Sequence, residues 1–218
     1  MQTSPPDTKT LIMDVAEKLF AEKGIDATST RAIVSEAGVN LAAINYHFGS
    51  KEGLLKAVIF RIVNKINDER LSQLDSLERN NQSPAINAII IAFLSPFAKI
   101  TQEQPNRCKY IIRLMGKLAS DPERFWRITK EIFTEVVMRF SAAIKRALPH
   151  LSENEVMWRF KFMLGAMIMV VAPRPLPDKL AKLEPAPDDI NQAIAYVIQF
   201  VSAGFQAPAV QDKPIPKN

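Results

Sequence analysis

The chain has 218 residues, of which 47% are hydrophobic, so it can build one large or two smaller packed domains. No apolar stretch reaches the roughly 18 to 20 residues of a membrane span, and we expect no signal peptide. The single cysteine, Cys108, excludes an internal disulfide and suits a reducing cytoplasm. The net charge of +5 favours a nucleic-acid partner, although residues 1–60 carry six basic and seven acidic side chains and are not themselves basic.

Residues 8–23 predict the first helix, because apolar side chains recur at helical spacing and Gly24 follows. We expect this helix to cover the motif that follows and to form its small core. Residues 1–7 and 207–218 are rich in polar residues and proline, and we expect both to be disordered tails.

The next stretch predicts two short helices joined by a tight turn. Ser29 or Thr30 can cap the first helix, Gly38 can end it in a left-handed conformation, and Asn40 can cap the second, at about residues 41–48. This arrangement is a helix-turn-helix, whose second helix can lie in the major groove of DNA.

Ser50 can cap a long helix over residues 51–79, which would span roughly 40 Å. We place the boundary between a DNA-binding domain, residues 8–54, and a second domain, residues 55–206, at the start of this helix. Movement of the helix could then pass directly to the DNA-reading helices.

The rest of the chain also has helical patterns, without the alternation typical of strands. The expected helices cover residues 85–101, 105–119, 122–148, 153–171 and 188–204, and a stiff connection at Pro173, Pro175 and Pro177 precedes the last. The sequence therefore predicts an all-α fold of about nine helices. A three-helix helix-turn-helix domain comes first, and a larger helical domain follows.

The last expected helix is apolar on two sides, so both sides must be covered. One stripe contains Ile190, Ile194, Val197, Val201 and Phe205, and the other contains Ala193, Tyr196, Phe200 and Ala203. Because the helix over residues 153–171 is also rich in apolar side chains, we expect a two-fold homodimer through the last two helices. Such a dimer would bind a near-palindromic DNA site.

The helix-turn-helix region resembles the DNA-binding domain of the tetracycline-repressor (TetR) family. The resemblance rests on Thr30-Arg31 … Ala37-Gly38-Val39 … Ile44-x-Tyr46-His47-Phe48-x-Ser50-Lys51-Glu52-x-Leu54 and covers about residues 8–60. It implies a dimeric transcription repressor that binds double-stranded operator DNA and responds to a small hydrophobic or amphipathic ligand. A weaker resemblance, carried by residues 40–48, is to members that respond to fatty acids or acyl thioesters.

The expected DNA contacts combine this resemblance with the chemistry of the side chains, since arginine and lysine can reach guanine or phosphate oxygens. The expected set is Thr30, Arg31, Asn40, Leu41, Ala42, Ala43, Asn45, Tyr46, His47 and Lys51. Asn45 stands where the family usually has tyrosine and could pair bidentately with adenine, while Leu41 replaces a commonly polar residue and offers apolar contact to a thymine methyl. Packing within the motif is the other interpretation of Tyr46 and His47.

A ligand site is expected in the second domain, where five of the eight methionines fall between Met138 and Met169. Flexible methionines mixed with phenylalanines suit an adaptable apolar pocket. The candidates are Phe93, Phe97, Met115, Phe133, Phe140, Met163 and Met167, with Arg113 and Lys117 as partners for an anionic head group. Ordinary core packing for the apolar side chains and a solvated face for the two cations are the alternatives.

Catalytic and metal-binding motifs are absent from the sequence. A single cysteine cannot form a paired-cysteine metal site, and there is no glycine-rich phosphate loop. We therefore expect no enzyme activity, no metal and no cofactor. Two functions remain: a ligand-responsive repressor, favoured by Arg31, Tyr46, His47 and Lys51, and a lipid or small-molecule carrier with a vestigial DNA-binding head.

Overall fold

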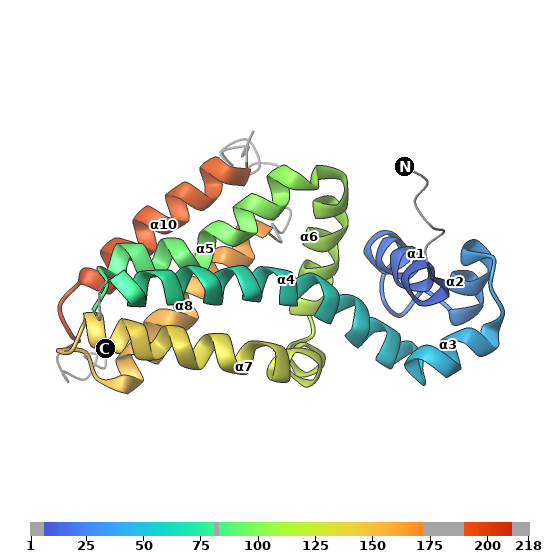
Figure 1. Cartoon of the computed structure of the whole chain (residues 1–218), viewed down its shortest axis with the longest axis horizontal. Helices are drawn as coiled ribbons and strands as arrows, with labels where there is room; N and C mark the ends of the chain where they lie inside the picture. Colours follow the sequence, from blue (N-terminus) through green and yellow to red (C-terminus); the bar gives the residue numbers. More distant parts are fainter. Residues whose placement is uncertain (1–6, 81–82, 172–189, 211–218) are drawn as a thin grey trace, which may run out of the picture.

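The computed structural model describes residues 7–80, 83–171 and 190–210, which contain nine α-helices and no strand (Figure 1). This confirms the all-α prediction. The helices are α1 (Thr8–Lys23), α2 (Thr30–Ala37), α3 (Leu41–Phe48), α4 (Lys51–Asn80), α5 (Ile86–Glu103), α6 (Pro105–Ala119), α7 (Pro122–Ala147), α8 (Glu153–Val171) and α10 (Ile190–Gln206). The predicted connection through Pro173, Pro175 and Pro177, and the predicted start of the last helix at residue 188, lie outside the described residues.

Local caps hold the helix-turn-helix of α2 and α3, as the sequence predicted. Ser29 Oγ accepts a hydrogen bond from the Ala32 N–H at 3.1 Å, and Asn40 Oδ1 accepts one from the Ala42 N–H at 2.9 Å. Gly38 ends α2 with a φ of +66°, a left-handed conformation that costs glycine little. The turn between the two helices is therefore fixed by contacts within the motif itself.

The helix α4 runs without interruption from the small head formed by α1, α2 and α3 into the larger helical domain (Figure 1). Ser50 caps its start by accepting from the Gly53 N–H at 3.0 Å. Ile59 belongs to the hydrophobic cluster of the head, whereas Ile66 and Leu74 belong to the cluster of the larger domain. One helix of 30 residues therefore contributes to both cores.

The core of the head extends beyond the helix that was expected to form it. Phe20 of α1 is buried in the same cluster as Leu114 and Leu118 of α6 and Ile128 of α7. Helical periodicity places these α6 and α7 side chains on the apolar faces of their helices. It does not show which part of the protein those faces contact, because the contacts join distant parts of the chain. The head is therefore packed directly against the corner between α6 and α7.

The larger domain is built around phenylalanines of α5, α7 and α8. The ring of Phe93 meets the rings of Phe140 and Phe160 edge to face, each at a centroid distance of 5.1 Å. Such aromatic pairs add to the stabilisation from burial alone. No helix of the described residues combines the length and the apolar character that crossing a membrane requires.

Residues 207–210, the start of the stretch expected to be a disordered tail, make hydrogen bonds with α8. Arg159 of α8 donates at 2.8–2.9 Å to the carbonyl oxygens of Gly204, Phe205, Ala207 and Pro208, and Glu155 accepts from the Val210 N–H at 2.9 Å. The last carbonyls of a helix lack partners within it, and a guanidinium group offers five donors for them. Residues 1–6 and 211–218 lie outside the described part of the chain.

Candidate nucleic-acid interface

The outer face of α3 is exposed at the end of the molecule farthest from α10 (Figure 1). Ile44 is buried and holds the helix on the core of the head. Leu41, Ala42, Asn45 and Tyr46 point outward, and Tyr46 is 85% exposed. Because α3 is the second helix of a helix-turn-helix, this face has the position that enters a major groove.

Three further candidates on or beside α3 have partners within the head. Ala43 is half-buried and packs against the core of the head. The His47 ring is half-buried between Tyr46 and Phe48, at centroid distances of 4.9 and 6.0 Å. Asn40 is exposed, but its amide oxygen serves the helix cap. His47 therefore contacts its neighbours within the motif, and Ala43 does not lie on the exposed outer face of α3.

Cationic groups lie at the starts of α2 and α4, the helices that precede and follow α3 in the chain. Arg31 is exposed on the first turn of α2, next to the half-buried Thr30. Lys51 begins α4, and its ammonium group donates to the Asp26 carbonyl oxygen at 3.2 Å. Helix starts offer unpaired N–H groups and a positive dipole end, both of which favour phosphate. Arg31 and Lys51 therefore add donors beside the exposed face of α3.

Gly53 supports this geometry, although the sequence analysis did not single it out. A Cβ atom at this position would overlap the carbonyl oxygen of Phe48, the last residue of α3. Only glycine therefore allows α4 to approach α3 so closely, which fixes the direction of α3 relative to α4. A glycine inside the first turn of a long predicted helix is the signal that points to such a close approach.

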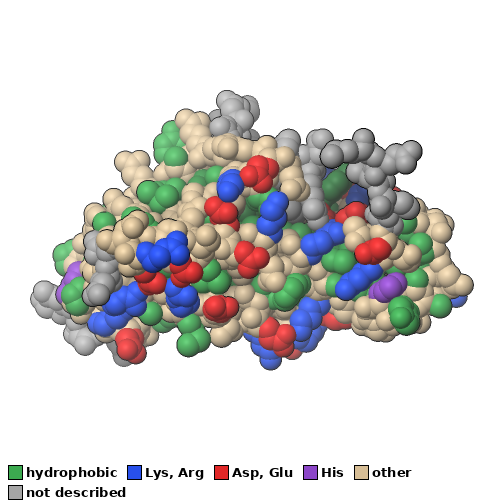
Figure 2. Space-filling view, in the orientation of Figure 1, with side chains coloured by type: hydrophobic (Ala, Val, Ile, Leu, Met, Phe, Trp, Pro, Cys, Tyr) green, Lys and Arg blue, Asp and Glu red, His purple; other side chains and the backbone are tan. Residues whose placement is uncertain are grey.

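The charge around the interface is mixed. Basic and acidic side chains are interspersed over the face of the molecule in Figure 2, without a large patch of one sign. Binding to DNA would therefore depend on a few well-placed donors more than on bulk charge. Within the described residues, no group of three or more His, Cys, Asp or Glu side chains could hold a metal ion.

The expected ligand-pocket residues are divided between the two cores. One group is buried together in the larger domain: Phe93, Phe97, Phe140, Met163 and Met167. Met115 and Phe133 are half-buried and pack against the cluster of the head. Met115 and Phe133 therefore pack in a different cluster from the other five candidates. The physical reason is that α6 and α7 face the head with one part of their apolar surface.

The structure places Lys117, a candidate partner for an anionic head group, against the end of α1. Its ammonium group donates to the carbonyl oxygens of Ala21 and Glu22 at 2.8 and 3.4 Å, at the end of α1. These carbonyls carry the partial negative charge of a helix C-terminus, which attracts a cation. Lys117 therefore fastens α6 to α1 and does not stand beside the buried phenylalanines. Arg113 is exposed, as expected for a solvated face.

Comparison with known proteins gives matches over both parts of the chain. The family model described as bacterial regulatory proteins, tetR family, matches residues 12–58, and the model described as tetracyclin repressor-like, C-terminal domain, matches residues 91–204. The chain is 34% identical over 61 residues to the HTH-type transcriptional regulator UidR of Escherichia coli strain K12, covering 28% of this chain and 31% of UidR. It is 26% identical over 147 residues to the HTH-type transcriptional repressor BepR of Brucella suis biovar 1, covering 65% of this chain and 66% of BepR.

Each of these alignments spans less than two thirds of the relative. The solved structure of the fatty acid degradation regulator FadR from Bacillus halodurans superposes with a TM-score of 0.65 at 15% identity, covering 94% of this chain and 99% of FadR. At this identity the likeness concerns the fold alone.

Proposed function

The chain belongs to the TetR family of DNA-binding transcriptional regulators, and from this premise we propose that it is a homodimeric repressor, released from a near-palindromic operator by a small apolar or amphipathic effector. Repression is supported by the name of BepR, a transcriptional repressor that is similar to this chain over 147 residues. The observation that carries DNA binding is the exposed outer face of α3, held in place by the buried Ile44.

In this proposal, base recognition depends mainly on Leu41, Asn45 and Arg31. Asn45 is exposed and offers a donor and an acceptor, the pair that matches adenine N7 and N6 in the major groove. Leu41 lies one turn earlier on the same helix and can contact a thymine methyl group. Tyr46 and Lys51 would donate to phosphate oxygens, which fix the orientation of the head without specifying sequence.

The dimer is proposed to form through α8 and α10. On α10, Val197 and Val201 are buried in the domain core, whereas Tyr196 and Phe200 are exposed. On α8, Phe162 is also exposed. Large exposed apolar side chains on adjacent helices favour contact with another chain, and a second copy related by a two-fold axis would place two identical α3 helices against one DNA duplex.

The effector is proposed to bind among α5, α7 and α8, where aromatic and methionine side chains form the core of the larger domain. Its binding would favour one tilt of α4, so that the two reading helices no longer fit successive major grooves. Only an effector with different affinities for the two arrangements can do this, and the coupling is typically about 1–3 kcal/mol. A long-chain acid or its thioester is the first compound to test.

Fluorescence anisotropy with DNA flanking the gene of this protein tests the DNA-binding proposal. Arg31→Ala should weaken binding by about 1–3 kcal/mol and relax the preference at one base pair. Lys51→Ala should weaken binding to all sequences alike and reduce the salt dependence by about one counterion. Arg79→Ala is the matched control, because Arg79 is an exposed cation at the far end of α4.

The control should bind like the wild type. If neither Arg31→Ala nor Lys51→Ala changes the affinity, the assignment of the interface to α2, α3 and the start of α4 is wrong. If the wild type binds no DNA specifically, the alternative function as a small-molecule carrier becomes the better account.

A further inference from the structure

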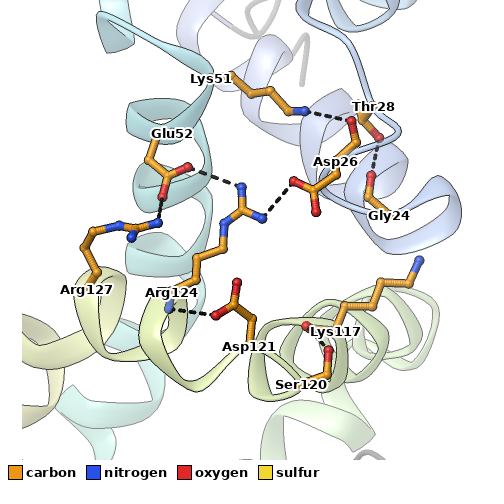
Figure 3. A network of polar contacts seen from close by, with 10 residues as sticks. All are labelled: Gly24, Asp26, Thr28, Lys51, Glu52, Lys117, Ser120, Asp121, Arg124 and Arg127. Atoms are coloured by element: carbon orange, nitrogen blue, oxygen red, sulfur yellow. Dashed lines mark hydrogen bonds and ion pairs between the residues drawn. The ribbon is translucent and has the colours of Figure 1, made fainter.

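A cluster of charged side chains joins the head to α7 (Figure 3). Arg124, in the first turn of α7, donates to Asp26 Oδ1 at 2.9 Å and to Glu52 Oε2 at 3.3 Å. Arg127 donates to the other oxygen of Glu52 at 3.1 Å. Asp26 lies in the connection between α1 and α2, and Glu52 lies in the first turn of α4, so Arg124 bridges two segments of the head.

The same cluster includes a residue of the candidate DNA interface. The backbone carbonyl of Asp26 accepts from Lys51, and the carboxylate of Asp26 accepts from Arg124 (Figure 3). Arg124 therefore contacts two residues that are linked to Lys51. Asp26 is the hydrogen-bond partner of the Lys51 ammonium group, and Glu52 follows Lys51 in the chain. The position of Lys51 is therefore tied to the position of Arg124.

Arg124 is well placed to hold both carboxylates at once. Its side chain is only 16% exposed, whereas the side chain of Arg127 is 59% exposed. The Asp121 side chain accepts from the backbone N–H of Arg124 at 3.0 Å, which fixes the start of α7. A guanidinium fork can pair with two acceptors in a defined geometry, which an ammonium group cannot.

These ion pairs contribute more to orientation than to folding. Exposed salt bridges stabilise a protein by about 0–1 kcal/mol each. Burial of Leu118 and Ile128 in the cluster of the head supplies the apolar contact between head and α6–α7 corner. The hydrogen bond and charge of Arg124 lower the pKa of Asp26, and Lys51 contributes to the same shift, so the Asp26 carboxylate interacts with both cations.

We propose that Arg124 is a positioning residue for operator binding, which occupies the Asp26 and Glu52 carboxylates and so leaves the Lys51 ammonium group available for a DNA phosphate. Without Arg124, the freed carboxylate of Asp26 would attract Lys51, whose ammonium group already contacts the carbonyl of the same residue. The inference rests on the proposed DNA binding, and it adds a direct link from α7 to the interface that does not run along the length of α4.

A double-mutant cycle on the full-length protein tests this role, with operator affinity and its salt dependence as the readouts. Arg124→Gln should weaken operator binding by about five- to hundredfold and lower the salt dependence by about one counterion. Adding Asp26→Asn should restore most of both losses, since no carboxylate then competes for Lys51. Arg127→Gln is the matched control for loss of one positive charge from the same cluster, and it should change the affinity by less than about fivefold.

Thermal unfolding of every variant shows whether it folds. If Arg124→Gln does not fold, Arg124→Lys replaces it, because lysine keeps the charge but cannot bridge both carboxylates, and it should show a smaller loss that Asp26→Asn also restores. Equal losses in the Arg124 and Arg127 variants, or no recovery on adding Asp26→Asn, would overturn the positioning role. Absence of specific binding by the wild type would instead refute the proposed function itself.

Discussion

Arg70 is a buried cation at the junction of α4 and α5. Its Nε donates to the Phe93 carbonyl at 2.7 Å, its Nη1 donates to Asn67 Oδ1 at 3.1 Å, and its guanidinium carbon lies 4.0 Å from the centroid of the Phe93 ring. No ion pair joins it to a carboxylate of the described residues. Burial lowers the pKa of Arg70 to about 9, so the charged form is disfavoured in the folded protein.

Arg70→Met should therefore stabilise the protein at pH 7. Methionine fills a similar space without a buried charge, and even buried charges that form ion pairs can be replaced by apolar residues with a neutral effect or a gain of about 1–4 kcal/mol. The pKa of Arg70 is lower in the folded state than in the unfolded state, so its cost is complete below about pH 9 and decreases as the pH rises further. The advantage of the variant over the wild type should consequently be constant up to about pH 8 and shrink as the pH rises from about 9 to 10.

Urea denaturation of the two proteins across this pH range provides the measurement, with Arg79→Met as the control for an exposed arginine. A variant that is clearly less stable at pH 7 would mean that the hydrogen bonds of Arg70 outweigh its desolvation.

At the residue scale, the sequence predicted contacts between near neighbours well and distant partners poorly. The caps at Ser29, Asn40 and Ser50 are confirmed by their hydrogen bonds. They could be predicted because each joins residues two or three positions apart. Lys117 and Arg70 meet backbone carbonyls of other helices, so nothing in their own segments indicates the partner. The packing of these helices has to be known before such contacts can be assigned.

At the scale of elements, α10 shows what helical periodicity can and cannot decide. Its two apolar stripes are confirmed as different faces, with Val197 and Val201 buried and Tyr196 and Phe200 exposed. The pattern alone did not show which face is turned inward. A charge at Val197 would disrupt the core of the domain, whereas a charge on the outer face can test association without that disruption.

Phe200→Glu should convert the proposed dimer to a monomer while the domain stays folded. Phe200 is 73% exposed, so the substitution adds no buried charge within the subunit but places one in the proposed interface. Sedimentation velocity at micromolar concentration would show the change of mass, and far-ultraviolet circular dichroism would confirm the fold. Phe60→Glu is the control, since Phe60 is also an exposed phenylalanine but lies on α4.

The control should remain dimeric. A wild type that sediments as a monomer under these conditions, or a Phe200→Glu variant that sediments as the wild type does, would rule out the interface through α8 and α10.

At the scale of the whole molecule, the head and the larger domain are joined by more than one route. The sequence predicted the uninterrupted α4, which contributes to both cores. It did not predict that α6 and α7 also meet the head, through Leu118 in the core and through the ion pairs of Arg124. Those contacts involve residues far apart in the chain and of ordinary type, so no local pattern distinguishes them.

Two routes have a consequence for regulation. A change in the larger domain can reach the head as a tilt of α4 or as a shift of the corner between α6 and α7. Because both routes end at the first turn of α4, next to Lys51, they would act on the same part of the interface. Under the proposed function, the orientation of two heads on one DNA duplex would be the quantity that an effector changes.

The spacing of the half-sites tests the central claim most directly, namely that a dimer reads DNA through two α3 helices. DNase protection on the DNA flanking the gene should reveal two half-sites about one helical turn apart, and inserting about five base pairs between them should abolish specific binding, because the second site then faces the opposite side of the duplex. Inserting a full turn should be less harmful than inserting half a turn. Protection that is unchanged by the half-turn insertion, or confined to a single half-site, would contradict the account.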